Sequence, residues 1–167
     1  LTTGVITLTG VTTVSGTLAE IKTAYASNSA GTITGLGDEA ISISDLGTVV
    51  SASDVADIEA LTTGAVTVAL SGTTITATSL NSLDASSTQS VNAGGVATLT
   101  GTAADVNTAY ASSGISGLGD EAVTLSDTSV AASTLSTVDG NTTGSVNAAT
   151  VTTLTGTAAE VTTALAS

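Results

Sequence analysis

The stretch Gly101–Ser112 reads GTAADVNTAYAS and repeats, with few changes, the earlier stretch Gly16–Ser27, GTLAEIKTAYAS. A second matching pair follows, because GLGDEAVTLSD at Gly117–Asp127 corresponds to GLGDEAISISD at Gly35–Asp45. Internal similarity at a spacing of tens of residues is typical of proteins in which one small unit stacks on the next. The sequence therefore predicts a repeat architecture and not a compact globule.

The two ends of the chain read as neighbouring pieces of the same pattern. Asn141–Val161 corresponds to Leu1–Ile21, and the chain contains no Met. We therefore expect residues 1–167 to form one continuous array of about six coils that continues beyond both ends into identical or similar units. The residues expected at the stacking seam are Leu1, Val161 and Leu165.

The composition favours a thin hydrophobic core. Although 41% of the residues are hydrophobic, Phe, Trp, Met, Cys, His and Pro are all missing, and Tyr25 and Tyr110 are the two aromatic residues. A deep core needs bulky side chains to reach native packing density. Ala, Val, Leu and Ile suffice for the narrow interior of a coil.

Three similar segments predict the starts of helices. In each, a Thr that follows Gly is succeeded three positions later by Asp or Glu, so that the hydroxyl and the carboxylate can cap the first backbone N–H groups at about 1 kcal/mol per cap. These pairs are Thr17 with Glu20, Thr102 with Asp105, and Thr157 with Glu160. Further helices are expected at Ser53–Leu61, near Leu80–Leu83, and at Ser129–Val138.

Between the helices, pairs of short β-prone segments are separated by a tight turn. Ile33–Leu36 precedes Ala40–Ser44, and Ile115–Leu118 precedes Ala122–Ser126. Strands joined through a helix run parallel and cross over right-handedly. The predicted fold is an α/β repeat, namely a right-handed solenoid of stacked strand–turn–strand–helix coils with parallel β-sheets and short Ala-rich helices along one side.

Charge and residue types exclude several classes of function. Lys22 is the one basic residue against 14 acidic residues, which gives a formal net charge of −13, so nucleic acid would be repelled. No apolar run is long enough to predict a membrane span. Without His or Cys, neither Ser–His nor Cys–His catalysis is available, and we expect no enzymatic activity.

The turns between the strands carry the best candidates for a metal site. Carboxylates and backbone carbonyls suit calcium, and the candidate ligands are Asp38, Glu39, Asp120 and Glu121. The alternative is that these residues fill a solvated turn. Calcium is the one cofactor that this pattern leaves open.

Surface sugars are a further open alternative. Asn141-Thr142-Thr143 is the one N-glycosylation sequon, and Thr and Ser are abundant on faces that should point outward. Glycan decoration could therefore occur if the protein is exposed at a cell surface.

The blocks LTGTAAEV, GLGDEAVTLSD and SVNAATVTTLTGTAAEV together carry a family resemblance. The chain resembles the giant secreted Thr-, Ala- and Gly-rich tandem-repeat surface proteins of marine cyanobacteria and other aquatic bacteria. The resemblance covers essentially the whole chain and implies an extracellular or cell-surface location, with a role like that of surface layers, adhesins and extracellular matrix.

Two functional hypotheses follow. In the first, the chain is a structural segment of an extracellular filament, sheath or surface layer, and its partners are copies of itself stacked head to tail or further repeats of the same chain. In the alternative, it is a stalk or binding module of an adhesin or phage fibre, which calcium could stabilise.

Overall fold

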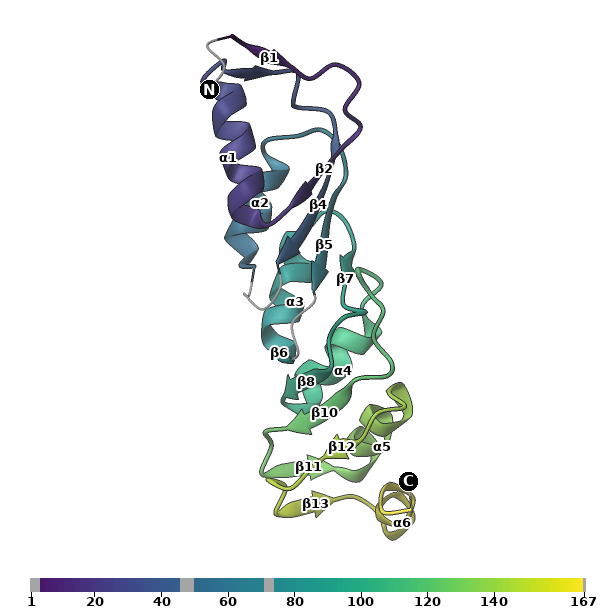
Figure 1. Ribbon diagram of the computed structural model, residues 1–167. Coiled ribbons are helices and arrows are strands. Elements are labelled where there is room, and N and C mark those ends of the chain that lie inside the picture. Colours follow the sequence, from purple (N-terminus) through teal and green to yellow (C-terminus); the bar gives the residue numbers. More distant parts are fainter. Residues whose placement is uncertain (1–3, 46–49, 71–73, 167) are drawn as a thin grey trace.

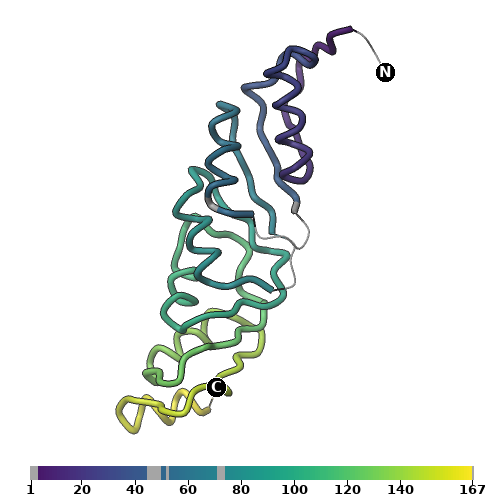
Figure 2. The backbone as a smooth tube through the Cα atoms, turned by 90° about the vertical axis from the view of Figure 1, so that its left-hand side faces the viewer, coloured from purple at the N-terminus to yellow at the C-terminus, as the bar shows by residue number. Residues whose placement is uncertain are grey.

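The computed structural model describes residues 4–45, 50–70 and 74–166. In these residues, six helices alternate with short parallel strands in an elongated α/β fold. The two ends of the chain lie at opposite ends of the molecule (Figures 1 and 2). We call each helix, together with the strands that directly precede it, a unit, and we number the units 1 to 6 along the chain.

The helices are 7 to 12 residues long. They are α1 (Leu18–Ser29), α2 (Ala52–Glu59), α3 (Ala77–Ser86), α4 (Ala103–Ala111), α5 (Ala132–Asn141) and α6 (Ala158–Ala164). A helix is thus present at each predicted place, and the short Leu80–Leu83 segment lies within the full helix α3. Isolated helices of this length are marginal in water, so docking on the strands must hold them.

The strands of units 1 to 3 are β1 (Ile6–Thr7), β2 (Thr13–Gly16), β3 (Ile33–Thr34), β4 (Ala40–Asp45), β5 (Val66–Leu70) and β6 (Thr74–Thr76). Those of units 4 to 6 are β7 (Val91–Asn92), β8 (Thr98–Gly101), β9 (Ile115–Ser116), β10 (Ala122–Leu125), β11 (Ser129–Ala131), β12 (Val146–Asn147) and β13 (Thr153–Thr155).

Every ladder between these strands is parallel and joins residues of successive units. The longest sheet has the order β2-β4-β5-β7-β9, and a second has the order β6-β8-β10-β12. Two further pairs, β1-β3 and β11-β13, lie at the two ends of the chain. In the long sheet, Val14 is opposite Ile41, and Val68 is opposite Val91. The predicted parallel sheets are confirmed.

Each helix from α2 to α5 contacts the next helix along the chain, and this row of helices turns along the length of the molecule. In Figure 1, α1 and α2 lie to the left of β2 and β4, whereas α5 and α6 lie to the right of β11 and β13.

Unit 5 has a third strand, β11, between β10 and its helix. The predicted helix Ser129–Val138 was therefore wrong at its start, because Val130 is buried in a strand opposite Leu154.

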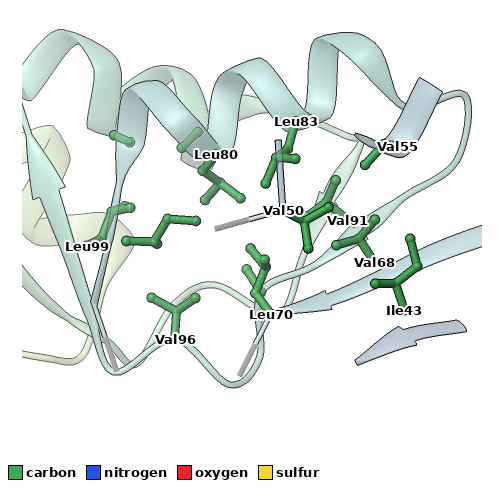
Figure 3. Packing of buried hydrophobic residues seen from close by; sticks show 14 of the residues in the cluster. Ile43, Val50, Val55, Val68, Leu70, Leu80, Leu83, Val91, Val96 and Leu99 are labelled. Carbon is green, nitrogen blue, oxygen red and sulfur yellow. The ribbon is translucent and has the colours of Figure 1, made fainter. Parts of the chain in front are cut away.

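The core is one continuous cluster of buried side chains between the helices and the strands, nearly all of them aliphatic. Along β5, Val66, Val68 and Leu70 are buried and alternate with half-buried residues, as expected of a strand with one face on the core. From α3, Leu80 and Leu83 point toward this cluster (Figure 3). Burying each such side chain contributes about 1.5–3 kcal/mol, so the cluster stabilises each helix on its strands.

Units 1 to 3 and units 4 to 6 are two copies of a larger block. The matching segments are Gly16–Ser27 with Gly101–Ser112, Gly35–Asp45 with Gly117–Asp127, and Thr62–Gly64 with Thr142–Gly144. Helix α1 corresponds to α4 and α2 to α5, whereas α6 follows GTAAE, which resembles GTLAE before α1 and GTAAD before α4. We call units 1 to 3 the first block and units 4 to 6 the second block.

Candidate functional site

The predicted caps lie at the N-termini of three helices. Thr17 and Thr157 each accept the N–H of the Glu three residues later, and each Glu carboxylate accepts the N–H of its Thr, at 2.9 Å for Glu20 and 2.7 Å for Glu160. These backbone hydrogen bonds, followed by those from the Thr hydroxyls, lower the pKa of Glu20 and of Glu160 below its ordinary value.

The third predicted cap lacks the hydrogen bond from the Thr backbone N–H that completes a capping box. Thr102 accepts the N–H of Asp105 at 3.1 Å and donates its hydroxyl to the Asp105 carboxylate at 2.8 Å. A complete capping box also joins Ser51 to Asp54 at the start of α2. Sequence reasoning missed that box, although the Ser-x-x-Asp pattern at 51–54 signals it.

In each of the two acidic turns, at residues 37–39 and 119–121, the Glu side chain points inward. Glu39 is 1% exposed, and its Oε2 accepts the N–H groups of Gly37 at 2.8 Å and Asp38 at 3.2 Å. In the second block, Glu121 is 2% exposed and accepts the N–H groups of Gly119 at 2.8 Å and Asp120 at 3.3 Å. Each Glu therefore satisfies the backbone of its own turn.

A Thr-Thr-Gly segment from the next unit closes over each of these turns. The Thr62 hydroxyl donates to the Glu39 carbonyl at 2.7 Å, and the Thr63 N–H donates to the Gly37 carbonyl at 2.9 Å. The Thr62 oxygen also accepts the N–H of Gly64 at 2.9 Å. We call this set of contacts the turn clamp.

The second block repeats the turn clamp closely. The Thr142 hydroxyl donates to the Glu121 carbonyl at 2.7 Å, and the Thr143 N–H donates to the Gly119 carbonyl at 2.8 Å. The Gly in the clamp is required by close approach, since a Cβ added to Gly144 would lie 2.2 Å from the Glu121 carbonyl oxygen. A Cβ added to Gly64 would likewise lie 2.2 Å from the Glu39 carbonyl oxygen. Sequence reasoning missed this role, although the Thr-Thr-Gly repeat was visible.

The two blocks differ in how the buried Glu is completed. The Tyr110 hydroxyl donates to Glu121 Oε1, and burial, followed by this carboxylate, raises the pKa of Tyr110. In the first block, neither the buried Tyr25 hydroxyl nor Glu39 Oε1 has a hydrogen-bond partner among the described residues.

The first block holds its turn through a different side chain. Helix α1 has 12 residues whereas α4 has 9, and Asn28 lies in the extra turn. The Asn28 amide bonds to both the carbonyl and the N–H of Leu36, each at 3.3 Å. This pair of hydrogen bonds joins the helix to the turn.

Other acidic residues link one unit to the next. Asp127 Oδ2 accepts the Ala103 N–H at 2.7 Å, so it caps the helix of the preceding unit. Glu59 accepts the Thr88 N–H at 2.8 Å, and Asp84 accepts the Ser112 hydroxyl at 2.6 Å. Acidic side chains on this surface therefore act as hydrogen-bond acceptors between units.

Lys22 on α1 reaches two carboxylates on α2. Its Nζ lies 2.9 Å from Asp54 Oδ1 and 3.3 Å from Asp57 Oδ2. The hydrogen bond to Asp54 is the main cause that raises the pKa of Lys22, while the Ser51 hydroxyl, and then Lys22, lower the pKa of Asp54. These pairs lie partly exposed to solvent and contribute little to stability.

The four candidate calcium ligands do not converge. Asp38 and Asp120 are exposed, whereas the adjacent Glu carboxylates are buried in their turns. Within residues 4–45, 50–70 and 74–166, no three acidic side chains form a group that could hold a metal ion. Calcium binding at these turns stays a prediction.

The sequon and the seam residues lie at distinct places. Asn141 is exposed at the end of α5, where its amide donates to Asn107 Oδ1 at 3.4 Å. Val161 is half-buried on α6, and Leu165, directly after that helix, is 73% exposed. Leu1 lies outside the described residues.

In the part of the chain that the structure describes, no helix is long and apolar enough to cross a membrane. Comparison of the chain with protein-family models, with curated proteins and with solved structures found no match.

Proposed function

We propose that this chain is a structural repeat segment of an extracellular filament, sheath or surface layer, folded as a right-handed solenoid of about six coils. The observation that carries the proposal is the turn clamp, which recurs in both blocks with a 2.7 Å bond from Thr to the Glu carbonyl. The turn clamp joins one unit to the next with the same geometry in both blocks. A long, stiff array requires such a repeated contact between its units.

Three kinds of contact act between neighbouring units. They are the parallel ladders, the turn clamps, and side-chain links such as Asp127 to Ala103. Because each unit mainly contacts its neighbours, the array can lengthen without a change in cross-section. The formal charge of −13 would keep such an array soluble, and the family resemblance supports a cell-surface location and a non-enzymatic role.

Small-angle X-ray scattering tests this proposal on the segment and on chains that carry two or three copies in tandem. The expected result is a maximum dimension that grows in proportion to copy number at a constant cross-sectional radius. A cross-section that grows with copy number would contradict a solenoid. Antibody labelling of intact source cells tests the extracellular location, and labelling seen only after lysis would contradict it.

A second candidate is the stalk of an adhesin or phage fibre. It rests on Asp38 and Asp120, which stand exposed at equivalent turns of the two blocks. A stalk would use the same solenoid as a spacer for a distal binding tip. Binding of glycans or proteins by the isolated segment would favour this candidate over a purely structural role.

A further inference from the structure

We propose that the turn clamp is a register switch, which ends one strand ladder and moves the next unit sideways by one ladder. This inference rests on the structural function proposed above and adds the residues that decide how the array winds. Its basis is a comparison of the junctions between successive units, some of which carry a clamp and some of which do not.

The strands of the described residues lie in four parallel ladders, which we number in the order in which the chain crosses them. Ladder 1 is β1-β3, ladder 2 is β2-β4-β5-β7-β9, ladder 3 is β6-β8-β10-β12, and ladder 4 is β11-β13. Strands β1 and β2 lie in ladders 1 and 2, whereas their sequence counterparts β7 and β8 lie in ladders 2 and 3. The same shift separates β3 and β4 from β9 and β10. The second block is thus displaced sideways by one ladder.

The displacement occurs where a clamp follows a helix. After α2, Thr62-Thr63-Gly64 closes over the turn behind β3, and the next strand, β5, pairs with β4 in ladder 2. After α5, Thr142-Thr143-Gly144 closes over the turn behind β9, and the next strand, β12, pairs with β10 in ladder 3. Among the described strands, β3 and β9 are therefore the last of their ladders.

Junctions without a clamp leave the ladder unchanged. After α3, the Ser87 hydroxyl and the Thr88 N–H donate to Glu59 on α2, at 3.3 Å and 2.8 Å, and β7 pairs with β5 in ladder 2. After α4, the Ser112 hydroxyl donates to Asp84 on α3 at 2.6 Å, and β9 pairs with β7 in the same ladder. The junction thus bonds to a carboxylate of the preceding helix where the ladder continues, and to turn carbonyls where it ends.

One position on the preceding helix distinguishes the two kinds of junction. This position lies eight residues after the N-cap, and its occupants are Tyr25 on α1, Glu59 on α2, Asp84 on α3 and Tyr110 on α4. An acidic residue there accepts the junction hydroxyl, and the ladder continues. Both clamped junctions have Tyr there, and Tyr110 donates its hydroxyl to the buried Glu121 of the turn that the clamp covers.

The position of the clamped turn explains why the next strand moves. The turn at residues 37–39 lies between β3 in ladder 1 and β4 in ladder 2. Glu39 accepts the N–H groups of this turn, while the Gly37 and Glu39 carbonyls accept Thr63 and Thr62 of the incoming chain. The incoming chain is therefore held at the turn, past β3, and its first strand pairs with β4. Unit 4, which carries no clamp, has Ala97 where unit 5 has Glu121.

The clamps account for the winding of the molecule. Helix α1 follows β2 in ladder 2, whereas its counterpart α4 follows β8 in ladder 3. With one clamp in the described part of each block, the row of helices moves by one ladder per block and turns around the sheets (Figures 1 and 2). An array of such blocks is a superhelix whose winding is set by the frequency of clamps.

Disulfide trapping within the full chain reads the register of β12, because the chain has no native Cys. Asn147 lies opposite Thr124 of β10, and it would lie opposite Ser116 of β9 if ladder 2 continued as it does at Asn92. Strands in one ladder are about 4.8 Å apart, which is within disulfide reach. Thr124→Cys with Asn147→Cys should therefore cross-link at least about fivefold more than Ser116→Cys with Asn147→Cys. Equal yields would contradict the step.

Transplanting the unclamped junction tests the switch itself. The transplant copies Asp84, Ala97, Ser112 and Ser113 onto the clamped junction as Tyr110→Asp, Glu121→Ala, Thr142→Ser and Thr143→Ser. We expect the cross-link between positions 116 and 147 to rise at least about fivefold over its yield without the transplant. A folded transplant that cross-links only between positions 124 and 147 would overturn the register switch.

Two milder variants decide the matter if the transplant does not fold. Thr142→Val removes both clamp hydrogen bonds of that side chain and should raise the cross-link between positions 116 and 147 at least about threefold. Val138→Ala opens a cavity under α5 but leaves the clamp in place, so it should not raise this yield. Equal yields from the two variants would overturn the proposal. A protein that fails this test but still scatters as a rod would retain the structural function.

Discussion

The Thr142 hydroxyl donates a 2.7 Å hydrogen bond to the backbone carbonyl of Glu121. The same Thr142 oxygen accepts the N–H of Gly144 at 3.0 Å. One side chain thus satisfies a backbone group in each of two successive units. Thr62 has the same relationship to Glu39 in the first block.

Replacing Thr142 by Val keeps the shape of the side chain and removes both hydrogen bonds. We expect the free energy of unfolding to fall by about 1–3 kcal/mol, because two partly buried backbone groups lose their partner. Urea denaturation measures this, with Thr12→Val as the control at an exposed residue, expected within about 0.5 kcal/mol of wild type. Equal stability of the two variants would show that the Thr142 hydroxyl contributes nothing to stability.

The Gly of the clamp should tolerate no side chain. A Cβ at position 144 would meet the Glu121 carbonyl oxygen at 2.2 Å, so Gly144→Ala should lower the free energy of unfolding by about 2 kcal/mol or more. Gly140 lies in α5 with no heavy atom near its added Cβ, and Gly140→Ala should stabilise by about 0.5–1 kcal/mol. Thermal unfolding of both variants compares the two. A stable Gly144→Ala protein would contradict the close approach.

The two equivalent tyrosines should respond oppositely to loss of the hydroxyl. Tyr110→Phe leaves a buried Glu121 oxygen without its donor and should destabilise by about 1–3 kcal/mol. Tyr25→Phe removes a buried hydroxyl that is unpaired among the described residues, so it should be neutral or stabilising. Chemical denaturation measures the free energy of unfolding of both variants. Equal losses of stability in the two variants would contradict the different roles of the two hydroxyls.

Tyr110 also predicts a loss of stability in alkali. Its pKa is raised above the ordinary value of 10.0 by burial and by Glu121. A group whose folded pKa is raised contributes stability below its unfolded pKa and loses that contribution as the pH rises through the folded value. Wild type should therefore lose more stability above about pH 10 than Tyr110→Phe does. If the stability of wild type and of Tyr110→Phe fell in parallel with rising pH, the raised pKa of Tyr110 would be contradicted.

The helix caps predict a loss of stability in acid. The folded pKa values of Glu20 and Glu160 lie below their ordinary 4.5, so their contribution is complete above that pH and is lost as the pH falls through the folded values. Melting temperatures between about pH 3 and pH 6 should fall less steeply for the double variant Glu20→Gln with Glu160→Gln. An unchanged slope would mean that these carboxylates do not cap.

Calcium should have little effect on the folded segment. The Glu39 and Glu121 carboxylates accept backbone N–H groups of their own turns, which leaves Asp38 and Asp120 alone at the surface. We expect the melting temperature in millimolar calcium to match that in chelator. A rise that disappears in the variant Asp38→Asn with Asp120→Asn would establish a calcium site and favour the stalk function.

The helix starts could be predicted because a cap is a local interaction. Thr17 and Glu20 stand three residues apart and meet as soon as the first turn forms. The same pattern at Ser51 and Asp54 was equally visible in the sequence. By contrast, Asp127 caps α4 across 24 residues, and no local spacing identifies that partner.

The clamp was visible as a repeat but not as a contact. Thr62-Thr63-Gly64 recurs at 142–144, which indicates a shared role without showing what it touches. Glu39 in a turn predicts a solvated side chain, yet the turn folds its carboxylate inward onto its own N–H groups. The direction of that side chain depends on the unit that covers it.

The sequence by itself determined the repeat, the three predicted capped helix starts, the parallel strands and the thin, mostly aliphatic core, because these follow from spacing, local capping and side-chain size. Only the tertiary structure decided that Glu39 and Glu121 are buried, that β11 precedes α5, and which carbonyls the Thr-Thr-Gly segments close over. Those features depend on contacts between units tens of residues apart, and such contacts exist only once the units have stacked.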